Sequence, residues 1–181
     1  LVEFSRIRSS LHESQLNLKL LLPFKISDDM DLDEMSKYFG LVAPYQNFDK
    51  LLSPDKFNLI IHPKSKNSAR EWNLENYDRL IHSLPQNKFK IFITGLKEEG
   101  QIIRQEMPGL FDHPHVTDLT GKFSLDELMS FVNQADGLLA CSTGVLHLAS
   151  ALGKRALGLY SPMKPIHPGR WMPLGKHSEY L

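Results

Sequence analysis

The sequence has almost no residues that could stabilise it by covalent cross-links. Its one cysteine, Cys141, cannot form a disulfide within the chain, so packing and hydrogen bonds must hold the fold. A single thiol is typical of proteins in reducing compartments. The longest apolar run, Leu20 to Phe24, is far shorter than the roughly 20 residues that a membrane-spanning helix needs. The sequence therefore predicts no transmembrane segment.

An excess of charge of one sign is also absent. The 21 lysines and arginines balance 21 aspartates and glutamates, so the formal net charge is zero. Proteins that bind nucleic acid or anionic membranes commonly carry an excess of positive charge. We therefore expect no nucleic-acid partner. The 181 residues, 41% of them hydrophobic, suffice for one globular domain of ordinary size with a small appendage.

From residue 57 onward, short apolar segments alternate with amphipathic ones. The predicted strands cover residues 58–62, 90–94, 115–119, 138–141 and 156–160. The predicted helices between them cover residues 75–84, 97–107, 125–133 and 145–152. Strands that alternate with helices in this way indicate a parallel sheet with helices on both faces. The fold class that we predict is α/β, with a Rossmann-like sheet.

The beginning of the chain has a different pattern. Residues 1–24 are predicted to be helical, with Pro23 as the stop signal. A second, short helix is predicted between Asp31, as its N-cap, and Gly40. We therefore divide the chain into a helical linker, residues 1–56, and a Rossmann-like domain, residues 57–181.

The turn at Ser142-Thr143-Gly144 follows one predicted strand and begins a helix. Open parallel sheets bind ligands at the carboxyl ends of their strands. Backbone N–H groups at a helix N-terminus favour phosphate there, although serine and threonine at this position also occur as plain N-caps. His147, on the first helical turn, either faces a ligand or is an ordinary packed histidine.

A second candidate is the loop His62 to Trp72, which follows the first predicted strand. Lys64, Lys66 and Arg70 lie in it with no acidic residue before Glu71. Clustered cations of this kind suit a phosphate or diphosphate. The alternative is a solvated loop whose charges only aid solubility.

Other chemistries have weaker support. The turn around Ser142 is close to a hydrolase nucleophile elbow, but the required order of serine, acid and histidine is not present after it. His113 and His115 have no set of partners at metal-ligand spacing, so we expect them to be solvated in a loop. The sequence contains neither a Walker motif nor a Gly-x-Gly-x-x-Gly fingerprint.

These stretches together resemble the C-terminal half of glycosyltransferase family 9, the ADP-heptose:lipopolysaccharide heptosyltransferase family, which has the two-domain GT-B fold. The most specific likeness is Ser142 to Gly153, which is similar to the family's Asp-Ser/Thr-Gly-x-x-His-x-x-x-Ala-Leu signature. The other matching stretches are His12-Glu13, His62-Pro63 with Arg70-x-Trp72, Thr94-Gly95 with Glu98-Glu99, Asp118 to Leu125, and Leu159 to Pro162.

The resemblance implies a domain that binds a nucleotide diphospho-sugar similar to ADP-heptose. Lys66 and Arg70, with Ser65, would reach the diphosphate, and Glu99 would contact the ribose. The turn after the fourth predicted strand would hold phosphate, and His147 would lie near the diphosphate or the sugar. The expected donor-binding residues are therefore Ser65, Lys66, Arg70, Glu99, Ser142, Thr143, Gly144 and His147.

The resemblance also implies the remaining features of the reaction. The sugar would pass to a glycolipid acceptor of the lipopolysaccharide-core type. The fold would need no metal, because cations and a helix N-terminus can stabilise the leaving diphosphate. The acceptor site and the catalytic base would lie in an N-terminal domain outside this sequence, so the fragment would be inactive alone. The implied location is cytoplasmic, or peripheral at the inner face of the bacterial inner membrane.

One departure from the family pattern leaves two alternatives open. Ser142 stands where the family usually has an acidic residue that contacts the donor sugar. The chain could therefore be a non-catalytic nucleotide-binding module that has lost this acid. It could also belong to a GT-B-shaped sugar-nucleotide epimerase, which would place its donor in the same crevice.

Overall fold

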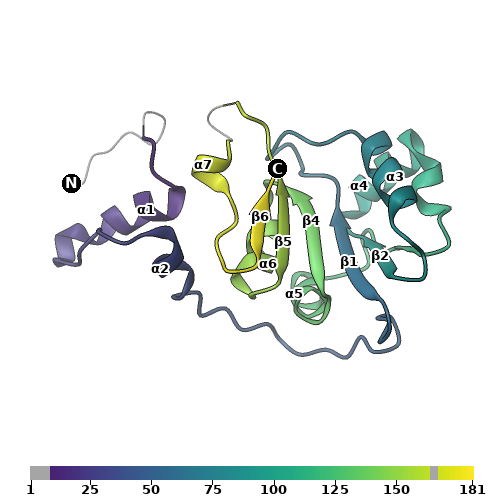
Figure 1. The fold of residues 1–181 in the computed structure, drawn as a ribbon, viewed down its shortest axis with the longest axis horizontal. Helices are drawn as coiled ribbons and strands as arrows, with labels where there is room; N and C mark the ends of the chain where they lie inside the picture. The colour runs from purple at the N-terminus through teal and green to yellow at the C-terminus, as the bar shows by residue number, and fades with distance from the viewer. Residues whose placement is uncertain (1–8, 164–166) are drawn as a thin grey trace.

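The computed structural model describes residues 9–163 and 167–181, and a six-stranded sheet forms its centre (Figure 1). The strand order is β3-β2-β1-β4-β5-β6, and every neighbouring pair is parallel. The predicted α/β class is therefore confirmed. The strands are β1 (Phe57–His62), β2 (Phe89–Ile93), β3 (Val116–Asp118), β4 (Gly137–Cys141), β5 (Arg155–Leu159) and β6 (Ser178–Tyr180).

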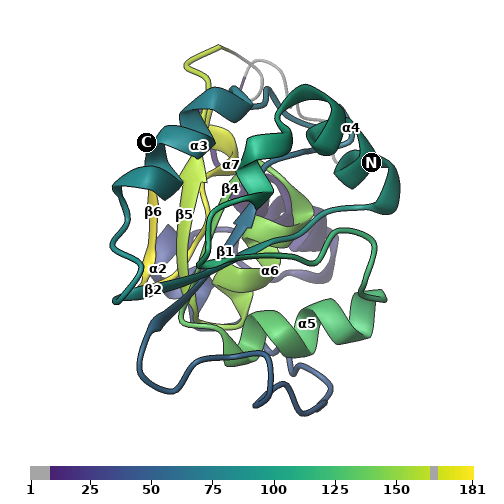
Figure 2. The ribbon, with the colours of Figure 1, turned by 90° about the vertical axis from the view of Figure 1, so that its right-hand side faces the viewer.

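Helices cover both faces of the sheet, as the alternating sequence pattern predicts. On one face, α3 (Leu74–Ser83) and α4 (Lys97–Glu106) pack over a core that includes Tyr77, Ile91 and Ile103. On the other face, α5 (Leu125–Gln134) and α6 (Gly144–Ala151) pack over a separate core. Figure 2 shows α3 and α5 on opposite sides of the strands.

The order of the strands determines where a ligand could bind. The chain leaves β1 towards α3 on one face, and it leaves the adjacent β4 towards α6 on the other face. Two neighbouring strands whose helices go to opposite faces leave a crevice at their carboxyl ends. The loops after β1 and β4, which carry most of the predicted donor-binding residues, therefore lie side by side.

Helix starts follow local sequence signals. Ser124 and Glu127 form the predicted capping box at the beginning of α5, with the Ser124 hydroxyl accepting from the Glu127 N–H. Asp31 caps α2 (Leu32–Ser36), as predicted. However, α2 ends at Ser36 rather than Gly40. Its side chains are not buried, so no packing extends it further.

The predicted first helix is wrong in its extent. Residues 1–8 lie outside the described residues, and within the rest the helix begins only at Glu13. It consists of α1 (Glu13–Leu18) followed by the 3-10 helix η1 (Lys19–Phe24). Pro23 was predicted to stop the helix, but it lies inside η1. The helix ends at Phe24, and the next residue, Lys25, adopts a left-handed conformation with φ 60°.

The structure also contains elements that the sequence analysis missed. These are β6, α7 (Pro168–Trp171) and the 3-10 helix η2 (Pro108–Phe111). Each has only three or four residues, which is too short for a hydrophobic period to be recognised. The strand β6 exists because its backbone pairs with β5, not because its own sequence Ser-Glu-Tyr favours a strand.

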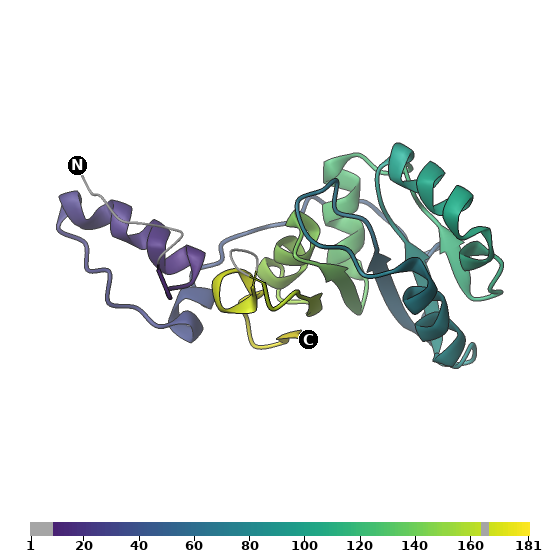
Figure 3. The same cartoon turned by 90° about the horizontal axis from the view of Figure 1, so that it is seen from above.

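The N-terminal helices lie at one end of the molecule, away from most of the sheet (Figure 3). They are attached to the rest through α7, where Arg170 forms an ion pair with Glu13 at 2.9 Å. The connector that follows runs back beneath α5, and Phe48 packs edge-to-face on Phe131 with ring centroids 5.2 Å apart.

Candidate donor-binding site

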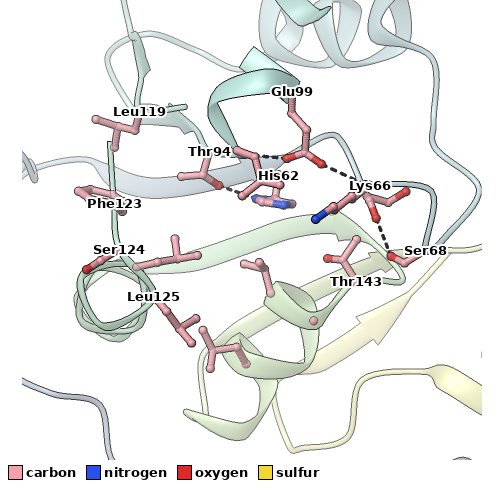
Figure 4. A pocket seen from close by; sticks show the side chains of 17 residues that line it. His62, Lys66, Ser68, Thr94, Glu99, Leu119, Phe123, Ser124, Leu125 and Thr143 are labelled. Atoms are coloured by element: carbon pink, nitrogen blue, oxygen red, sulfur yellow. Dashed lines mark hydrogen bonds between the residues drawn. The ribbon is translucent and has the colours of Figure 1, made fainter. Parts of the chain in front are cut away.

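A cavity of about 470 Å³ lies at the carboxyl ends of the first four strands. It contains Ser65, Lys66, Glu99, Thr143 and Gly144, which are five of the eight predicted donor-binding residues. Lys66 and Thr143 come from different loops and face the same space (Figure 4). The chain thus brings together residues that are far apart in the sequence.

The loop after β1 is held in shape by its own hydrogen bonds. The Ser65 N–H and hydroxyl both donate to Glu71 Oε1, at 2.7 and 3.0 Å. Lys66 and Asn67 have φ values of 48° and 64°, in the left-handed region that non-glycine residues adopt at a cost. The backbone therefore turns sharply here, and the exposed Lys66 side chain lies at the cavity.

The three cations of this loop have different environments. Lys64 forms ion pairs with Glu71 at 2.9 Å and with Glu106 at 3.7 Å, so its charge is already balanced. Arg70 lies outside the cavity, where it borders a second hollow of about 330 Å³ and donates to Met163 Sδ. Of the three, only Lys66 lines the main cavity.

Glu99 connects two walls of the cavity. Its Oε1 accepts from the Lys66 N–H at 3.0 Å, and its Oε2 accepts from the Leu96 N–H at 2.7 Å. The carboxylate is buried and fixes the loop after β1 relative to the start of α4. A carboxylate can accept about four hydrogen bonds, so capacity for a ligand hydroxyl remains.

The turn after β4 presents an unusual hydroxyl. Thr143 is the N-cap of α6, yet its Oγ1 caps no backbone N–H and is buried with no hydrogen-bond partner among the described residues. A buried polar atom without a partner is destabilising, so its persistence points to a ligand. A Cβ built on Gly144 would meet no atom within 4 Å, so there is open space beside the helix N-terminus.

Two further groups line this cavity and are not among the predicted donor-binding residues. His62 is buried and its Nδ1 lies 3.0 Å from Thr94 Oγ1. Burial lowers the pKa of His62, although Glu99 and Glu71 offset part of this effect. Opposite the polar loops lies an apolar wall, which is formed by Leu119, Phe123, Leu125, Leu128, Val145 and Leu148. Apolar wall residues carry no motif, so only the folded chain reveals them.

Ser142 and His147 do not line the main cavity. Ser142 hydrogen-bonds Tyr160, where burial raises the tyrosine pKa to about 12 and the serine opposes that shift. His147 lies 6.3 Å from Trp171, measured between ring centroids. Burial lowers the pKa of His147, and nearby His12 lowers it further. His147 therefore lies on the side of α6 that faces α7, whereas Ser142 precedes that helix.

His113 and His115, which follow η2, were predicted to be solvated in a loop, and this prediction is wrong. His115 is 7% exposed, and His113 pairs with Asp78 on α3. The chain folds back so that α3 covers this segment, which spacing alone could not reveal.

Within the described ranges 9–163 and 167–181, no helix is long and apolar enough to cross a membrane.

Comparison with known proteins identifies the family. Residues 6–180 match the family model described as "Glycosyltransferase family 9 (heptosyltransferase)". The chain belongs to glycosyltransferase family 9. The resemblance based on the Ser142–Gly153 stretch is therefore confirmed, and with it the relation to proteins of lipopolysaccharide-core biosynthesis.

Two relatives from Haemophilus influenzae resemble the chain over part of their length. The lipopolysaccharide core heptosyltransferase OpsX of Haemophilus influenzae is 23% identical over 122 residues, which are 67% of this chain and 35% of OpsX. A putative glycosyltransferase of the same organism is 25% identical, over 97% of this chain and 53% of its own length. The chain thus spans about half or less of these relatives.

Two solved structures of glycosyltransferases share the fold. The family 9 glycosyl transferase from Veillonella parvula superposes on all of this chain with a TM-score of 0.70 and 16% identity, which covers 52% of that protein. E. coli heptosyltransferase WaaC with ADP has a TM-score of 0.59 and 20% identity, over 81% of this chain and 47% of WaaC. At these identities the likeness demonstrates a common fold.

Proposed function

We propose that this chain is the donor-binding half of a glycosyltransferase, and that it binds a nucleotide diphospho-sugar similar to ADP-heptose. The whole enzyme would transfer the sugar to a lipopolysaccharide-core-type acceptor. The observation that carries the proposal is the buried, unpaired Thr143 hydroxyl, which lies at the N-terminus of α6 in a cavity that Lys66 also lines. Family membership supports the reaction type.

The polar side of the cavity suits a diphosphate. The Thr143 hydroxyl can donate to a phosphate oxygen, and the helix N-terminus favours negative charge. Lys66 supplies a cation that no acidic side chain neutralises through an ion pair among the described residues. These groups would bind the diphosphate and stabilise the charge that develops on it as the sugar leaves.

The apolar side of the cavity suits a nucleobase. Phe123 and the neighbouring leucines and valine form a surface on which a planar base can lie without losing hydrogen bonds. Glu99, between the apolar and polar walls, is placed to accept from ribose hydroxyls. The structure of the relative WaaC with ADP supports a nucleoside diphosphate as the first ligand to test.

Calorimetric titration of the full chain with ADP, GDP and UDP tests the proposal. We expect binding of at least one nucleotide, and we expect Lys66→Ala to weaken it roughly tenfold, since a hydrogen bond to a charged group contributes about 1.5–3 kcal/mol. Lys50→Ala is the matched control, because Lys50 is exposed on the connector and does not line the cavity. No binding at millimolar nucleotide, or equal binding by both variants, would contradict the proposal.

Ser142 supports a second candidate, a nucleotide-binding module without transferase activity. The hydroxyl lies beside Tyr160 and carries no charge where the family usually has an acid. We expect Ser142→Asp, in the protein that also carries the acceptor-binding domain, to raise sugar transfer at least tenfold if the missing acid limits the reaction. Ser142→Asn is the uncharged control. Efficient transfer by the unmodified protein would instead exclude the non-catalytic alternative.

A further inference from the structure

His62 lies at the centre of the crevice between the strands. It is the last residue of β1, and its side chain lines the main cavity. In the sheet it pairs with Ala140 of β4, shortly before the turn that carries Thr143. Figure 4 shows the His62 ring directed into the space that Lys66 and Thr143 also line. An anion held at the start of α6 would therefore have this imidazole as a neighbour.

The two ring nitrogens of His62 have different surroundings. Nδ1 lies 3.0 Å from the Thr94 hydroxyl oxygen. Nε2 makes no hydrogen bond with a described residue, and it is not enclosed by protein atoms as Thr143 Oγ1 is. Nε2 is therefore accessible from the main cavity, where the Thr143 hydroxyl also lacks a partner among the described residues. Two polar groups without partners in one cavity indicate a polar ligand.

The Thr94 hydroxyl is compatible with both protonation states of His62. A hydroxyl can donate to Nδ1 of the neutral ring, or it can accept from the Nδ1–H of the imidazolium. When Thr94 donates, the single proton of the neutral ring is on Nε2. In both states Nε2–H is therefore available to the cavity, and His62 can gain a proton without losing its contact with Thr94.

The charges around His62 favour the neutral ring in the ligand-free protein. Burial lowers its pKa below 6.5, and Glu99 and Glu71 offset only part of that effect. Glu99 belongs to α4, whereas Glu71 and Lys66 belong to the loop after β1. The segments around α5 and α6 contribute only uncharged side chains to the cavity. A bound anion would supply the additional negative charge that raises the pKa of an imidazole.

We propose that His62 is a further donor-binding residue, whose Nε2–H donates a hydrogen bond to the diphosphate and whose ring takes up a proton from solvent as the anion binds. This role rests on the proposed function of the cavity. A hydrogen bond from imidazolium to a phosphate oxygen is roughly twice as strong as one between neutral groups. Because binding of the donor and binding of the proton are coupled, each strengthens the other.

Donor affinity should depend on pH in one direction. The pKa of His62 is higher in the complex than in the free protein, so binding takes up a proton between those two values. Affinity is constant above the pKa of the complex and increases as the pH falls through it. The increase is at most about tenfold per pH unit, because one proton is involved, and it ends below the pKa of the free protein.

Calorimetric titration of the full chain with ADP-glucose at several pH values tests this role. The diphosphate of this ligand is a diester, so it lacks the ionisation with a pKa of about 6 that a terminal phosphate has. We expect the affinity to increase at least about fivefold from about pH 7.5 to about pH 6. Binding enthalpies in two buffers of different ionisation enthalpy should show that a proton is taken up.

His62→Gln provides the variant, because glutamine keeps an N–H donor but cannot titrate. We expect it to bind ADP-glucose with an affinity that no longer depends on pH. His177→Gln, which alters an exposed histidine outside the main cavity, should retain the pH dependence of the unmodified chain. Circular dichroism verifies that each variant is folded. A pH dependence that is absent from the unmodified chain, or equal in His62→Gln, would overturn the role of His62.

An NMR titration of His62 in sulfate and in chloride, at equal ionic strength, needs neither a nucleotide nor a variant. Sulfate has a constant charge near neutral pH, and in the position of the diphosphate it should raise the pKa of His62. The absence of binding by any nucleotide would contradict the proposed function. In that case the sulfate measurement decides separately, and an equal pKa of His62 in both salts would overturn anion binding by this residue.

Discussion

At the scale of single residues, we expect the Thr143 hydroxyl to contribute to ligand binding but not to the stability of the ligand-free protein. Because Oγ1 is buried without a partner, Thr143→Val removes no hydrogen bond from the ligand-free protein. We expect the free energy of unfolding to stay constant or to rise by up to about 1 kcal/mol, while ADP affinity falls roughly five- to tenfold. Urea denaturation and calorimetry measure the two effects.

Thr94→Val is the matched control for this prediction. The Thr94 hydroxyl is also buried in the cavity, but it is hydrogen-bonded to His62. Its loss should lower the unfolding free energy by about 1 kcal/mol. Equal destabilisation by Thr143→Val and Thr94→Val would mean that the Thr143 hydroxyl has a hydrogen-bond partner within the protein. Its burial would then be no indication of a ligand.

Lys66 and Glu99 show how much of the site depends on residue type alone. The sequence alone shows a cation, Lys66, after the first strand and an acid, Glu99, in the helix after the second strand. It does not show their contact, because the contact requires β1 and β2 to lie in register, with Ile61 beside Ile93. That alignment brings the Lys66 N–H to the Glu99 carboxylate.

At the scale of elements, α1 is held against α7 by contacts between polar side chains and backbone. The side chains of Arg170 and Glu13 are only 13% and 7% exposed, and the guanidinium also packs over Trp171. Beside this ion pair, His12 Nε2 lies 3.0 Å from the Met172 carbonyl oxygen. The two helices are therefore coupled although their residues are far apart in the sequence.

We expect Arg170→Met to lower the unfolding free energy by about 1.5–3 kcal/mol, because it removes a hydrogen-bonded ion pair with Glu13. Hydrogen exchange should increase in α1 and α7 more than in the central strands. Equal exchange in α1 before and after Arg170→Met would contradict this view of the interface.

At the scale of the whole molecule, buried histidines make stability depend on pH. Burial lowers the pKa of His12, His62 and His147 below the ordinary value of 6.5. The unfolded chain therefore takes up protons more readily than the folded one. Their contribution is complete above about pH 6.5 and is lost as the pH falls below that value towards the lower pKa values of the folded state.

We expect the unfolding free energy to decrease from about pH 7 to about pH 5, by up to about 1.4 kcal/mol per pH unit for each of these histidines. Urea denaturation across this range measures the slope. His62→Gln should reduce the slope, and the exposed His177→Gln should not. A slope that stayed the same in His62→Gln would contradict the assignment to this residue.

The longer strands could be predicted from the sequence, whereas the shortest elements and the start of the first helix could not. The strands β1, β2, β4 and β5 are mostly apolar, so composition located each of them to within one residue. The strand β6 and helix α7 have no such signal, since they form through pairing with β5 and contact with α1. Within residues 9–24 the predicted helix starts too early, because leucine content indicates a helix without fixing where it begins.

The sequence by itself determined the class of the sheet, the loops that end its strands and the family, because apolar periodicity and the Ser142–Gly153 stretch are local properties of the chain. Only the tertiary structure decided which side chains share a space. In the folded chain Lys64 forms an ion pair with Glu71, and Arg70 and His147 lie outside the main cavity. The Thr143 hydroxyl has no hydrogen-bond partner among the described residues. Strand order and register control these contacts, and both depend on the packing of the whole molecule.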